Sequence, residues 1–593
     1  MLRSPHNHES SRGEEAMSKK TIQTRRKVLL LSVLVLGVLL LRAQTLAGAQ
    51  TLEERVKEFT LKNGMRFLVV ERHEAPVVLC SIAFDVGSAN DWPSMSGASH
   101  LLEHMMFKGT RQIGTKNYKK EIPYIRKTDL LGERTIALRK EIGEWRFTIF
   151  QAFEREVIVG FTAAERECIG TDQYNEIKLF VEKVRGMSTM PYTLTSTPYL
   201  IEDRGKNFLD LYLEYKLAWG EIGRLLDEQR RYIERDELIE TYTNNGAEKL
   251  NAFTSYDYTL YYVYLPANKL SLWMTMESDR MENPIFREFW SERNVVMEER
   301  RLGENNADRV LSEAFFSVAF SASPYKQPII GWMGDLQALD RKKLIEYHRV
   351  YYAPTNAIAV IVGDVDQKIV KKMAQHYFEQ IPAQTTPPPA DTREPEQTGE
   401  RRVVVEHFAN PRLMIGYHKP TYPHPDDVTL QVLSRILASG RTSRFYKMLY
   451  EKKKLTAGPP WAYSGPGSRY DNLLIIGAEP RHPHTLEEVE AAIYEEIERL
   501  KREPVADREL QRIKNQYEAW LIRRMGSNPT IAFQLASTQI VRGDYRAMLN
   551  EVEMIKKVSA DDVMEAAKRY LVERNRTVGY RIQVKKEAGK DDR

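Results

Sequence analysis

The most restrictive feature of this sequence is a pair of histidines four residues apart in an apolar segment, Ser99–Thr110. In an α-helix, residues four apart lie on the same face, so His100 and His104 would stand one turn apart and could bind one metal ion. Glu103 would lie close enough to take a proton from a water on that metal, but it is poorly directed to be a third ligand. The pattern H-x-x-E-H therefore predicts a metal site that carries its own general base.

A surface helix with two solvated histidines is the alternative interpretation. Histidine accounts for only 12 of 593 residues, so the pattern would arise by chance in roughly two chains per hundred of this length. The intervening residues also make the segment too apolar for a solvated helix. These residues are Leu101, Leu102, Met105, Met106 and Phe107. We therefore expect the polar trio to face a cavity.

Several separate blocks of the chain resemble the insulinase/pitrilysin-type zinc peptidases, particularly their two-domain processing-peptidase branch. H-x-x-E-H is the inverzincin motif of such enzymes. The similarity extends from about residue 53 to residue 581. The blocks are Ser99–Thr110, Leu250–Ser255 followed by Asp257–Thr259, Glu292–Arg300, and Ser323–Tyr325 with Ile330–Gly331.

This resemblance implies that one zinc ion per chain is held by His100, His104 and a glutamate from a second helix, which by position is Glu299. A further glutamate seven residues earlier, Glu292, would support the first ligands. Seven residues are close to two helical turns, so both carboxylates would share one face, whereas Glu298 would point elsewhere. Without the upstream histidines, a solvated acidic helix face would be the preferred interpretation of this run.

The resemblance implies an α+β fold with two homologous sandwich-like halves, each a mostly antiparallel sheet with helices on one face, that form a clam-like chamber. Glu299 follows His104 by 195 positions, which is more than relatives usually show and indicates a long helical insertion, either a lid or docking arm or mere surface decoration. Its outer parts, Lys119–Trp145 and Phe208–Glu240, have the pattern of long charged helices with apolar stripes, which could pair as an antiparallel hairpin. The expected organisation is an N-terminal extension and signal at 1–49, a catalytic domain at 50–382 with the insertion at about 111–241, a linker at 383–400, a second domain without zinc ligands at 401–586 and a tail at 587–593.

An internal repeat supports two duplicated halves. The segment Leu344–Asn356 is echoed by Val563–Asn575 at a constant separation of 219 positions. The expected counterpart of the metal helix, Val428–Ala438, contains no histidine. One half would therefore carry the chemistry while the other covers it.

These features predict a zinc-dependent endopeptidase that cleaves extended or unfolded peptides, with Glu103 as the general base. In the family that this chain resembles, substrate adds as a strand to a sheet edge near the zinc, which here implicates Asn251, Ala252, Phe253 and Thr254. Main-chain hydrogen bonds along such an edge hold a peptide without reading its sequence. A plain central strand is the alternative interpretation of this segment.

One departure leaves a second hypothesis open. Many relatives carry, in the second half, an arginine and a tyrosine seven residues apart that touch the substrate, whereas this chain has Tyr450 and Ala457 there. Arg441 and Arg444 are candidate substitutes, although surface or capping roles fit them as well. The chain could act as a homodimer, beside a zinc-less partner subunit of the same fold, or as a non-catalytic subunit of such an assembly.

Composition excludes several other classes of protein. The 87 basic and 82 acidic residues leave a net charge of only +5, and no basic patch interleaved with aromatic residues indicates nucleic-acid binding. The two cysteines, Cys80 and Cys168, are too few for a disulfide framework. Cys80 lies in an apolar run typical of a buried strand, which favours a packed thiol over a ligand or disulfide.

The N-terminal region has the pattern of a secretory signal. Counted from a probable start at Met17, basic residues precede the 14-residue apolar run 28–41, which is short for a membrane span, and small residues suit cleavage after Ala49. We therefore expect a periplasmic or secreted protein. Arg25 and Arg26 would allow a twin-arginine route, an uncleaved segment would anchor the chain in a membrane, and a mitochondrial presequence is disfavoured because the run is not amphipathic.

Overall fold

The computed structural model describes residues 52–144, 146–147, 150–151, 202–203, 206–387 and 392–584. The chain forms two compact units, Met1–Lys57 and Glu58–Arg593, and the second unit contains both halves predicted from the sequence. Among the described helices, none combines the length and apolar character needed to cross a membrane. The predicted signal, the C-terminal tail, Cys168 and most of the middle of the insertion lie outside the described residues.

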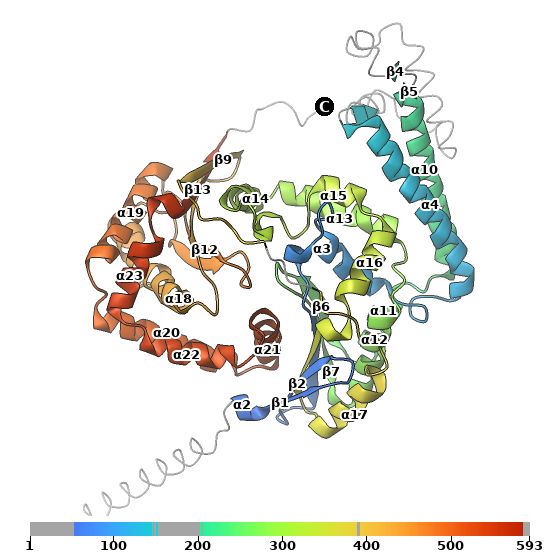
Figure 1. Ribbon diagram of the computed structural model, residues 1–593, viewed down its shortest axis with the longest axis horizontal. Helices are drawn as coiled ribbons and strands as arrows, with labels where there is room; N and C mark the ends of the chain where they lie inside the picture. Colours follow the sequence, from blue (N-terminus) through green and yellow to red (C-terminus); the bar gives the residue numbers. More distant parts are fainter. Residues whose placement is uncertain are drawn as a thin grey trace, which may run out of the picture. The chain divides into compact units, whose positions relative to one another are not determined.

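The first half is built on a six-stranded sheet in the order β1-β2-β8-β3-β7-β6. Its strands β1, β2, β6 and β7 are labelled in Figure 1. Strands β2 and β8 are parallel, while β3 pairs antiparallel with both β8 and β7, and β6 pairs antiparallel with β7. Cys80 lies in the central strand β3, where its thiol is buried and free, as predicted. The strands are β1 (Val56–Thr60), β2 (Arg66–Glu71), β3 (Val77–Phe84), β6 (Glu248–Thr254), β7 (Thr259–Pro266) and β8 (Ala357–Gly363).

The second half repeats this plan in a five-stranded sheet with the order β11-β12-β10-β13-β9. Only β13 and β9 are parallel; the other pairs are antiparallel. The parallel pair at one side and the antiparallel strands beyond it occur in the same order as in the first sheet. The strands are β9 (Arg401–His407), β10 (Arg412–Lys419), β11 (Trp461–Gly465), β12 (Asn472–Ala478) and β13 (Arg576–Gln583).

The described residues of Glu58–Arg593 form sixteen helices around the sheets, together with a π-helical segment at Tyr446–Lys452 and a small hairpin of β4 (Glu202–Asp203) and β5 (Lys206–Asn207). Those of the first half are α3 (Ala98–Met105), α4 (Tyr118–Ile142), α10 (Phe208–Gln229), α11 (Glu237–Asn244), α12 (Leu270–Glu282), α13 (Phe289–Glu304), α14 (Ala307–Ala319), α15 (Met333–Ala338), α16 (Arg341–Tyr351) and α17 (Gln367–Tyr377). Those of the second half are α18 (Pro425–Ala438), α19 (Leu486–Arg502), α20 (Asp507–Arg524), α21 (Asn528–Arg542), α22 (Ala547–Lys557) and α23 (Ala560–Tyr570), and the short α2 (Leu52–Arg55) precedes β1.

Matching hydrogen bonds show that the two halves are structural repeats. The Asn356 amide donates to the carbonyls of Tyr351 and Asp85, at 2.9 and 3.1 Å. The Asn575 amide, 219 positions later, donates to the carbonyls of Tyr570 and His418, both at 2.8 Å. In each half this amide ties a helix, α16 or α23, to the end of a neighbouring strand, β3 or β10, which confirms the two-half fold predicted from the sequence.

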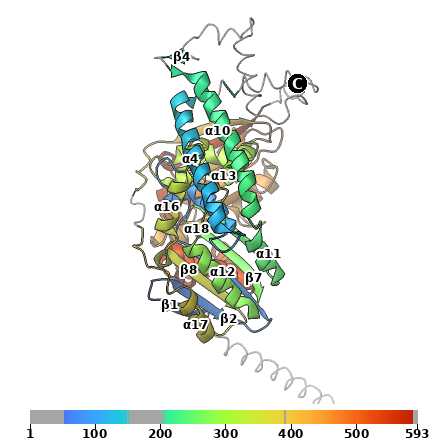
Figure 2. The same ribbon diagram turned by 90° about the vertical axis from the view of Figure 1, so that its right-hand side faces the viewer.

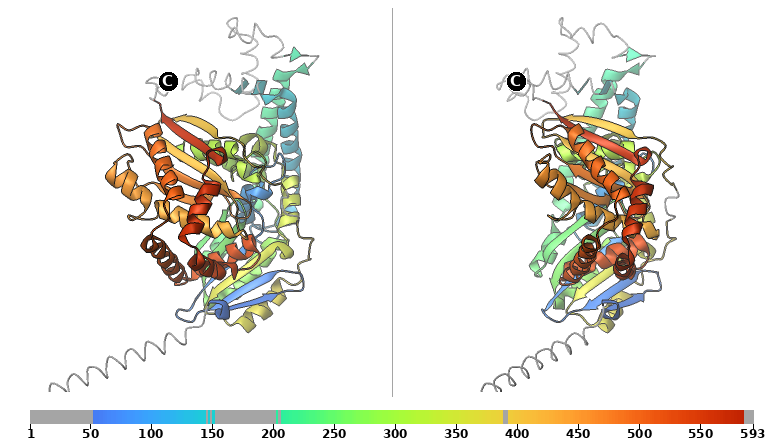
Figure 3. Two further views of the ribbon diagram at one scale, coloured as in Figure 1. Left: turned by 60° about the vertical axis from the view of Figure 1, so that its left-hand side comes forward. Right: turned by 90° about the vertical axis from the view of Figure 1, so that its left-hand side faces the viewer.

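The two halves exchange one helix each. Helix α14 of the first half packs on β9 and β13, while α21 of the second half packs on β3 and β8 (Figures 1 and 3). Phe315 of α14 is fully buried against Gly416 and Gly579, where added Cβ atoms would approach its ring to 2.8 and 2.9 Å. Because helices cover both faces of the central strands, β3 and β8 can be almost entirely apolar.

The insertion contains a helical hairpin. Helices α4 and α10 lie side by side along their lengths (Figures 1 and 2), and the two-helix pairing predicted from their apolar stripes is therefore present. The sequence-based prediction of one helix from Phe208 to Glu240 was wrong. Helix α10 ends at Gln229, and a 3-10 turn at Arg230–Tyr232 leads to the separate helix α11, because Ile233 adopts an extended conformation to bridge with Thr115.

One buried guanidinium joins the base of this hairpin to both helices that carry the predicted metal ligands. Arg287, which precedes α13, donates to the carboxylate of Glu121 in α4 at 3.0 Å, and both side chains are almost completely buried. Its other N–H groups donate to the carbonyls of Lys108, Thr110 and Ile113, just after α3. These contacts fix the start of α13 against the end of α3.

We expect Arg287→Met to lower the thermal unfolding midpoint strongly, because it leaves the Glu121 carboxylate buried without a counter-charge and removes one donor from each of three backbone carbonyls. Breaking a buried ion pair from one side typically costs about 3–5 kcal/mol. The double variant Arg287→Met/Glu121→Met should be more stable than Arg287→Met alone. Equal midpoints for the single and double variants in calorimetric scans would contradict this account.

Candidate metal centre

Helix α3 is oriented by a buried carboxylate outside the helix. Asp91 accepts hydrogen bonds from the backbone N–H groups of Gly97 and Ser99, at 2.7 and 3.0 Å, and so caps the helix in place of an N-cap side chain. Burial raises the pKa of Asp91 to about 7. Gly97 has φ +88°, and an added Cβ there would lie 2.4 Å from the Ile330 carbonyl oxygen. The start of α3 is thus held by contacts that only glycine permits.

The structure brings three sequence-predicted ligands together. His100 Nε2 lies 3.9 Å from one carboxylate oxygen of Glu299, and His104 Nε2 lies 3.8 Å from the other. Candidate ligand atoms of the three residues lie within 4.8 Å of one another, and among the described residues this is the one such His/Cys/Asp/Glu cluster. Two imidazoles and one carboxylate are a donor set of catalytic zinc sites with three protein ligands, so the residues fit a zinc ion.

Glu292 fixes the orientation of one imidazole. Its carboxylate lies 3.0 Å from His104 Nδ1 and 2.7 Å from Lys108 Nζ. Although burial would raise the pKa of Glu292, the bond to His104 and the charge of Lys108 lower it to about 2. The ionised carboxylate accepts a hydrogen bond from the Nδ1–H of His104. The Nε2 atom of the same ring is then directed at Glu299, as expected when a carboxylate supports a metal ligand.

The two histidines differ in their electrostatic surroundings. Burial, reinforced by the charges of His104 and Arg309, lowers the pKa of His100 to about 3. Burial also acts to lower the pKa of His104, but the hydrogen bond with Glu292 and the nearby carboxylate charges raise it overall. At neutral pH, His100 is therefore available as an unprotonated ligand, whereas protons compete more strongly with a metal ion for His104 than for His100.

Glu103 lies beside the trio and bonds to the edge of the first sheet. Its carboxylate accepts a 2.6 Å hydrogen bond from the hydroxyl of Thr254, at the end of β6. Burial raises the pKa of Glu103 above its usual value, a tendency that the Thr254 bond only partly offsets. A carboxylate with a raised pKa that stays partly exposed is suited to accept and return a proton near neutral pH.

A cavity of about 480 Å³ opens beside these groups. It is lined by His100, Glu103, Glu299, Ala252, Phe253, Thr254, Tyr256, Arg309, Ser312, Glu313, Phe316 and residues 328–330. Three of the four residues predicted to contact substrate therefore face it. Asn251 does not line the cavity; its side-chain oxygen accepts from the N–H of Ala252. Strand β6 is the outer strand of its sheet, so its far edge has no strand partner among the described residues.

The second half contributes no side chain to the lining of this cavity among the described residues. Arg444 is mostly buried and is paired with Glu509 and Glu496, at 3.2 and 3.6 Å. Tyr450 packs beneath the guanidinium of Arg481. Arg309 of α14 does line the cavity. It could not be identified from the sequence, because no motif marks it. Its position depends on the fold of α14 beside α13, where the Arg309 guanidinium lies against Gly303.

Comparisons with known proteins agree with this arrangement. The sequence model described as insulinase (peptidase family M16) matches residues 66–125 and 229–332, and the model described as peptidase M16 inactive domain matches residues 338–517. A zinc protease PqqE of Helicobacter pylori is 30% identical over 331 residues, which span 54% of this chain and 73% of that protein. An uncharacterized zinc protease YmxG of Bacillus subtilis is 21% identical, over 57% of this chain and 81% of that protein.

Solved structures share the fold. The crystal structure of a protease from Helicobacter pylori superposes with a TM-score of 0.65 and 21% identity, covering 89% of this chain and 99% of that chain. The periplasmic protease PqqL from Escherichia coli gives a TM-score of 0.61 and 15% identity, covering 90% of this chain and 48% of that chain.

We expect Glu292→Gln to weaken zinc binding at neutral pH by roughly 10–100-fold, because the neutral amide loses the negative charge that strengthens the bond to His104 Nδ1–H and pairs with Lys108. The same change removes the group that raises the pKa of His104, so the rise of zinc affinity with pH should shift to lower pH. Competition with a chromophoric chelator between pH 5 and 8 measures both effects. An unchanged pH profile would show that Glu292 does not control the protonation of His104.

Proposed function

Because this chain belongs to the insulinase family of peptidases (M16), we propose that it is a zinc-dependent endopeptidase that cleaves extended or unfolded peptides. The observation that carries the proposal is the convergence of His100, His104 and Glu299, with His100, Glu299 and the neighbouring Glu103 lining one cavity. We further propose one zinc ion per chain at this trio.

When bound there, zinc supplies Lewis acidity that lowers the pKa of a water molecule toward about 7 and polarises the scissile carbonyl. The Glu103 carboxylate takes the proton of the attacking water and returns it to the leaving amine. Thr254 donates to that carboxylate and keeps it in place while it is ionised. Glu292 holds the imidazole of His104 so that its Nε2 faces the ligand cluster.

The free edge of β6 supports an extended substrate. Its end, Ala252–Thr254, runs along the cavity that contains Glu103, so a peptide added to this edge would pass the general base. Phe253 packs edge-on against Tyr258 and against Phe533 of α21, which anchors this end of the strand to the second half. Backbone pairing of this kind selects for an unfolded chain and against a folded protein.

A second candidate function is that of a partner-dependent or non-catalytic subunit. It is favoured by the lack of a second-half residue in the cavity lining described above and by Tyr450 and Ala457 at the positions of the arginine and tyrosine of relatives. A homodimer or a zinc-less partner of the same fold would then complete the substrate site. Zinc-dependent cleavage by the purified chain, measured together with its oligomeric state, separates the two functions.

We also propose that the protein is exported to the periplasm or secreted, with cleavage near Ala49. Sequencing the N-terminus of the protein purified from its native cells tests this, and an intact N-terminus on a membrane-bound protein would instead support an anchor formed by residues 28–41.

We expect Glu103→Gln to retain zinc but to lose at least roughly 10²–10⁴-fold in kcat, because the amide cannot accept the proton. Zinc content by atomic absorption and cleavage of a long unstructured peptide, with and without chelator, measure the two effects. Normal cleavage by this variant would remove the general-base assignment. Loss of zinc together with activity would instead show that Glu103 is needed to hold the metal.

We expect Arg309→Ala to lower kcat/KM for the same peptide by roughly tenfold without changing zinc content, because its guanidinium lines the cavity and can donate to a substrate carbonyl or carboxylate. Arg309→Lys should restore part of the loss. Arg441→Ala in the second half is the matched control and should cleave normally. A loss confined to Arg441→Ala would return this role to the second half.

A further inference from the structure

The inserted hairpin and the metal-bearing helix enclose a second cavity, of about 420 Å³. Its walls come from α4, α10 and α13, with Gln151 and Gln337 at its margins. The residues of these three helices that line the cavity are Thr135, Ile136, Arg139, Tyr212, Tyr215, Lys216, Trp219, Arg293, Asn294, Met297, Glu298 and Arg301. The volume is within the usual range of small-molecule sites, and four of the lining side chains are cationic while one is acidic.

Arg293 is a buried cation without a counter-charge at the wall of this cavity. Its side chain is 3% exposed, and two of its hydrogen bonds go to the backbone carbonyls of Gln337 and Leu339. No carboxylate pairs with it among the described residues, and its Nε is buried without a hydrogen-bond partner. Burial and the charge of Arg139 lower the pKa of Arg293, but only to about 10, so it stays protonated at neutral pH.

The neighbouring groups do not neutralise this charge. Arg139 lies 2.7 Å from its own partner, Glu144, and Arg301 lies 2.8 Å from Glu298. The guanidinium of Arg293 stacks over the rings of Trp290 and Trp219, at 4.7 and 5.7 Å. Such stacking leaves the Nε hydrogen of Arg293 without an acceptor.

Trp219 carries a second buried donor that has no acceptor. The indole Nε1 of Trp219, which also lines the cavity, is buried without a hydrogen-bond partner. The unpartnered Nε of the Arg293 cation and the unpartnered Nε1 of Trp219 thus belong to two residues that line one hollow rich in nitrogen donors. Unsatisfied buried polar groups are rare in native proteins, and each calls for an explanation. An acceptor that carries negative charge would satisfy both donors and the charge together.

We propose that this cavity binds a small oxyanion, a molecule that presents a carboxylate or phosphate group to Arg293 and Trp219. Arginine suits this role because its planar fork matches the geometry of both groups. Lys216 of α10, Arg139 of α4 and Arg301 of α13 surround the same space, so a bound anion contacts both arms of the insertion and the helix that carries Glu292 and Glu299. An anion bound here would be a ligand of the insertion itself, and its binding does not require peptidase activity.

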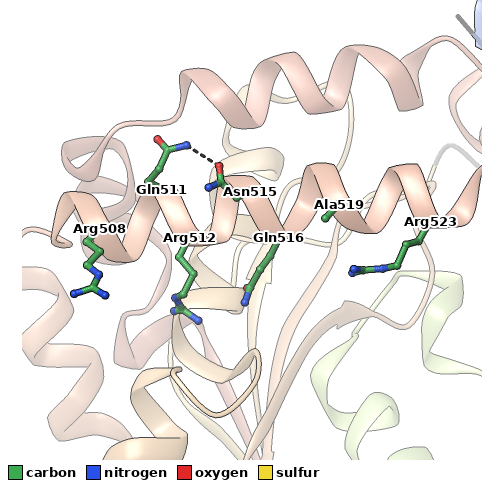
Figure 4. A pocket seen from close by; sticks show the side chains of 7 residues that line it. All are labelled: Arg508, Gln511, Arg512, Asn515, Gln516, Ala519 and Arg523. Atoms are coloured by element: carbon green, nitrogen blue, oxygen red, sulfur yellow. Dashed lines mark hydrogen bonds between the residues drawn. The ribbon is translucent and has the colours of Figure 1, made fainter. Parts of the chain in front are cut away.

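A basic hollow on α20 provides a comparison. It is lined by Arg508, Gln511, Arg512, Asn515, Gln516, Ala519 and Arg523, which project from one helix face (Figure 4). Gln511 and Asn515 already bond to each other, and Arg512 donates to Thr442. Arg508 and Arg523 are exposed to solvent. This surface carries similar positive charge but lacks buried, aromatic walls. Anion binding that depends on it therefore measures non-specific attraction.

Titration of the full chain with inorganic pyrophosphate, and separately with citrate, tests the proposal by tryptophan fluorescence and by calorimetry. Trp219 and Trp290 flank the site, so binding should change the emission saturably. Trp219→Phe, which removes one of the two proposed donors, should reduce both that change and the affinity measured by calorimetry. The pyrophosphate and citrate arms distinguish a phosphate from a carboxylate ligand. Absence of saturable binding by both anions at 150 mM salt would overturn the proposal.

Variants locate the binding. Arg293→Gln should weaken the affinity at least tenfold, and Lys216→Gln, on a partly exposed side chain that should leave the fold intact, by severalfold. Arg134→Gln removes a surface ion pair with Glu214 on the same hairpin and should bind normally, as should Arg523→Gln on α20. If Arg293→Gln does not fold, Lys216→Gln decides. Equal weakening by Arg134→Gln or Arg523→Gln would show non-specific attraction and contradict the site.

Discussion

The arrangement of the candidate metal centre depends on the buried guanidinium of Arg287. The two helices that carry the predicted ligands, α3 and α13, are separated by nearly two hundred residues, including the inserted hairpin. Arg287 donates to three carbonyls that follow α3 and to Glu121 at the base of the hairpin. Because a buried arginine tolerates no loss of these partners, its position fixes the start of α13, and with it Glu292 and Glu299.

The exchange of α14 and α21 explains why the chain needs both halves although one carries the ligands. Each helix covers a sheet face of the other half, and Phe315 reaches that face only because Gly416 and Gly579 leave room for its ring. Separation of the halves would expose the apolar faces of both sheets. The same exchange brings Arg309 to the metal cavity and Phe533 against Phe253, so covering the sheets and shaping the cavity share the same elements.

Different surroundings give chemically identical side chains at the candidate site different pKa values. His100 and His104 stand one turn apart, yet burial lowers the pKa of the first while Glu292 raises that of the second. Glu103 and Glu292 are both carboxylates beside the trio, but Lys108 and His104 keep Glu292 ionised, whereas burial raises the pKa of Glu103. One glutamate is thereby suited to hold an imidazole and the other to move a proton.

The sequence by itself determined what depends on local spacing and composition. A four-residue interval placed His100 and His104 on one helix face, a seven-residue interval did the same for Glu292 and Glu299, and a 219-residue echo indicated the duplicated halves. Apolar stripes likewise indicated the helical hairpin. These features follow from helix geometry and burial periodicity, which the order of residues encodes directly.

Only the tertiary structure decided which distant groups meet. Four features depend on segments that share no periodic relation along the chain. They are the Thr254 bond to Glu103, the place of Arg309 at the cavity, the burial of Arg444 in ion pairs and the unpaired charge of Arg293. Their positions depend on how helices cross and on which sheet face each helix covers. Such crossings are set by side-chain packing summed over the whole core, and no single stretch of sequence contains that information.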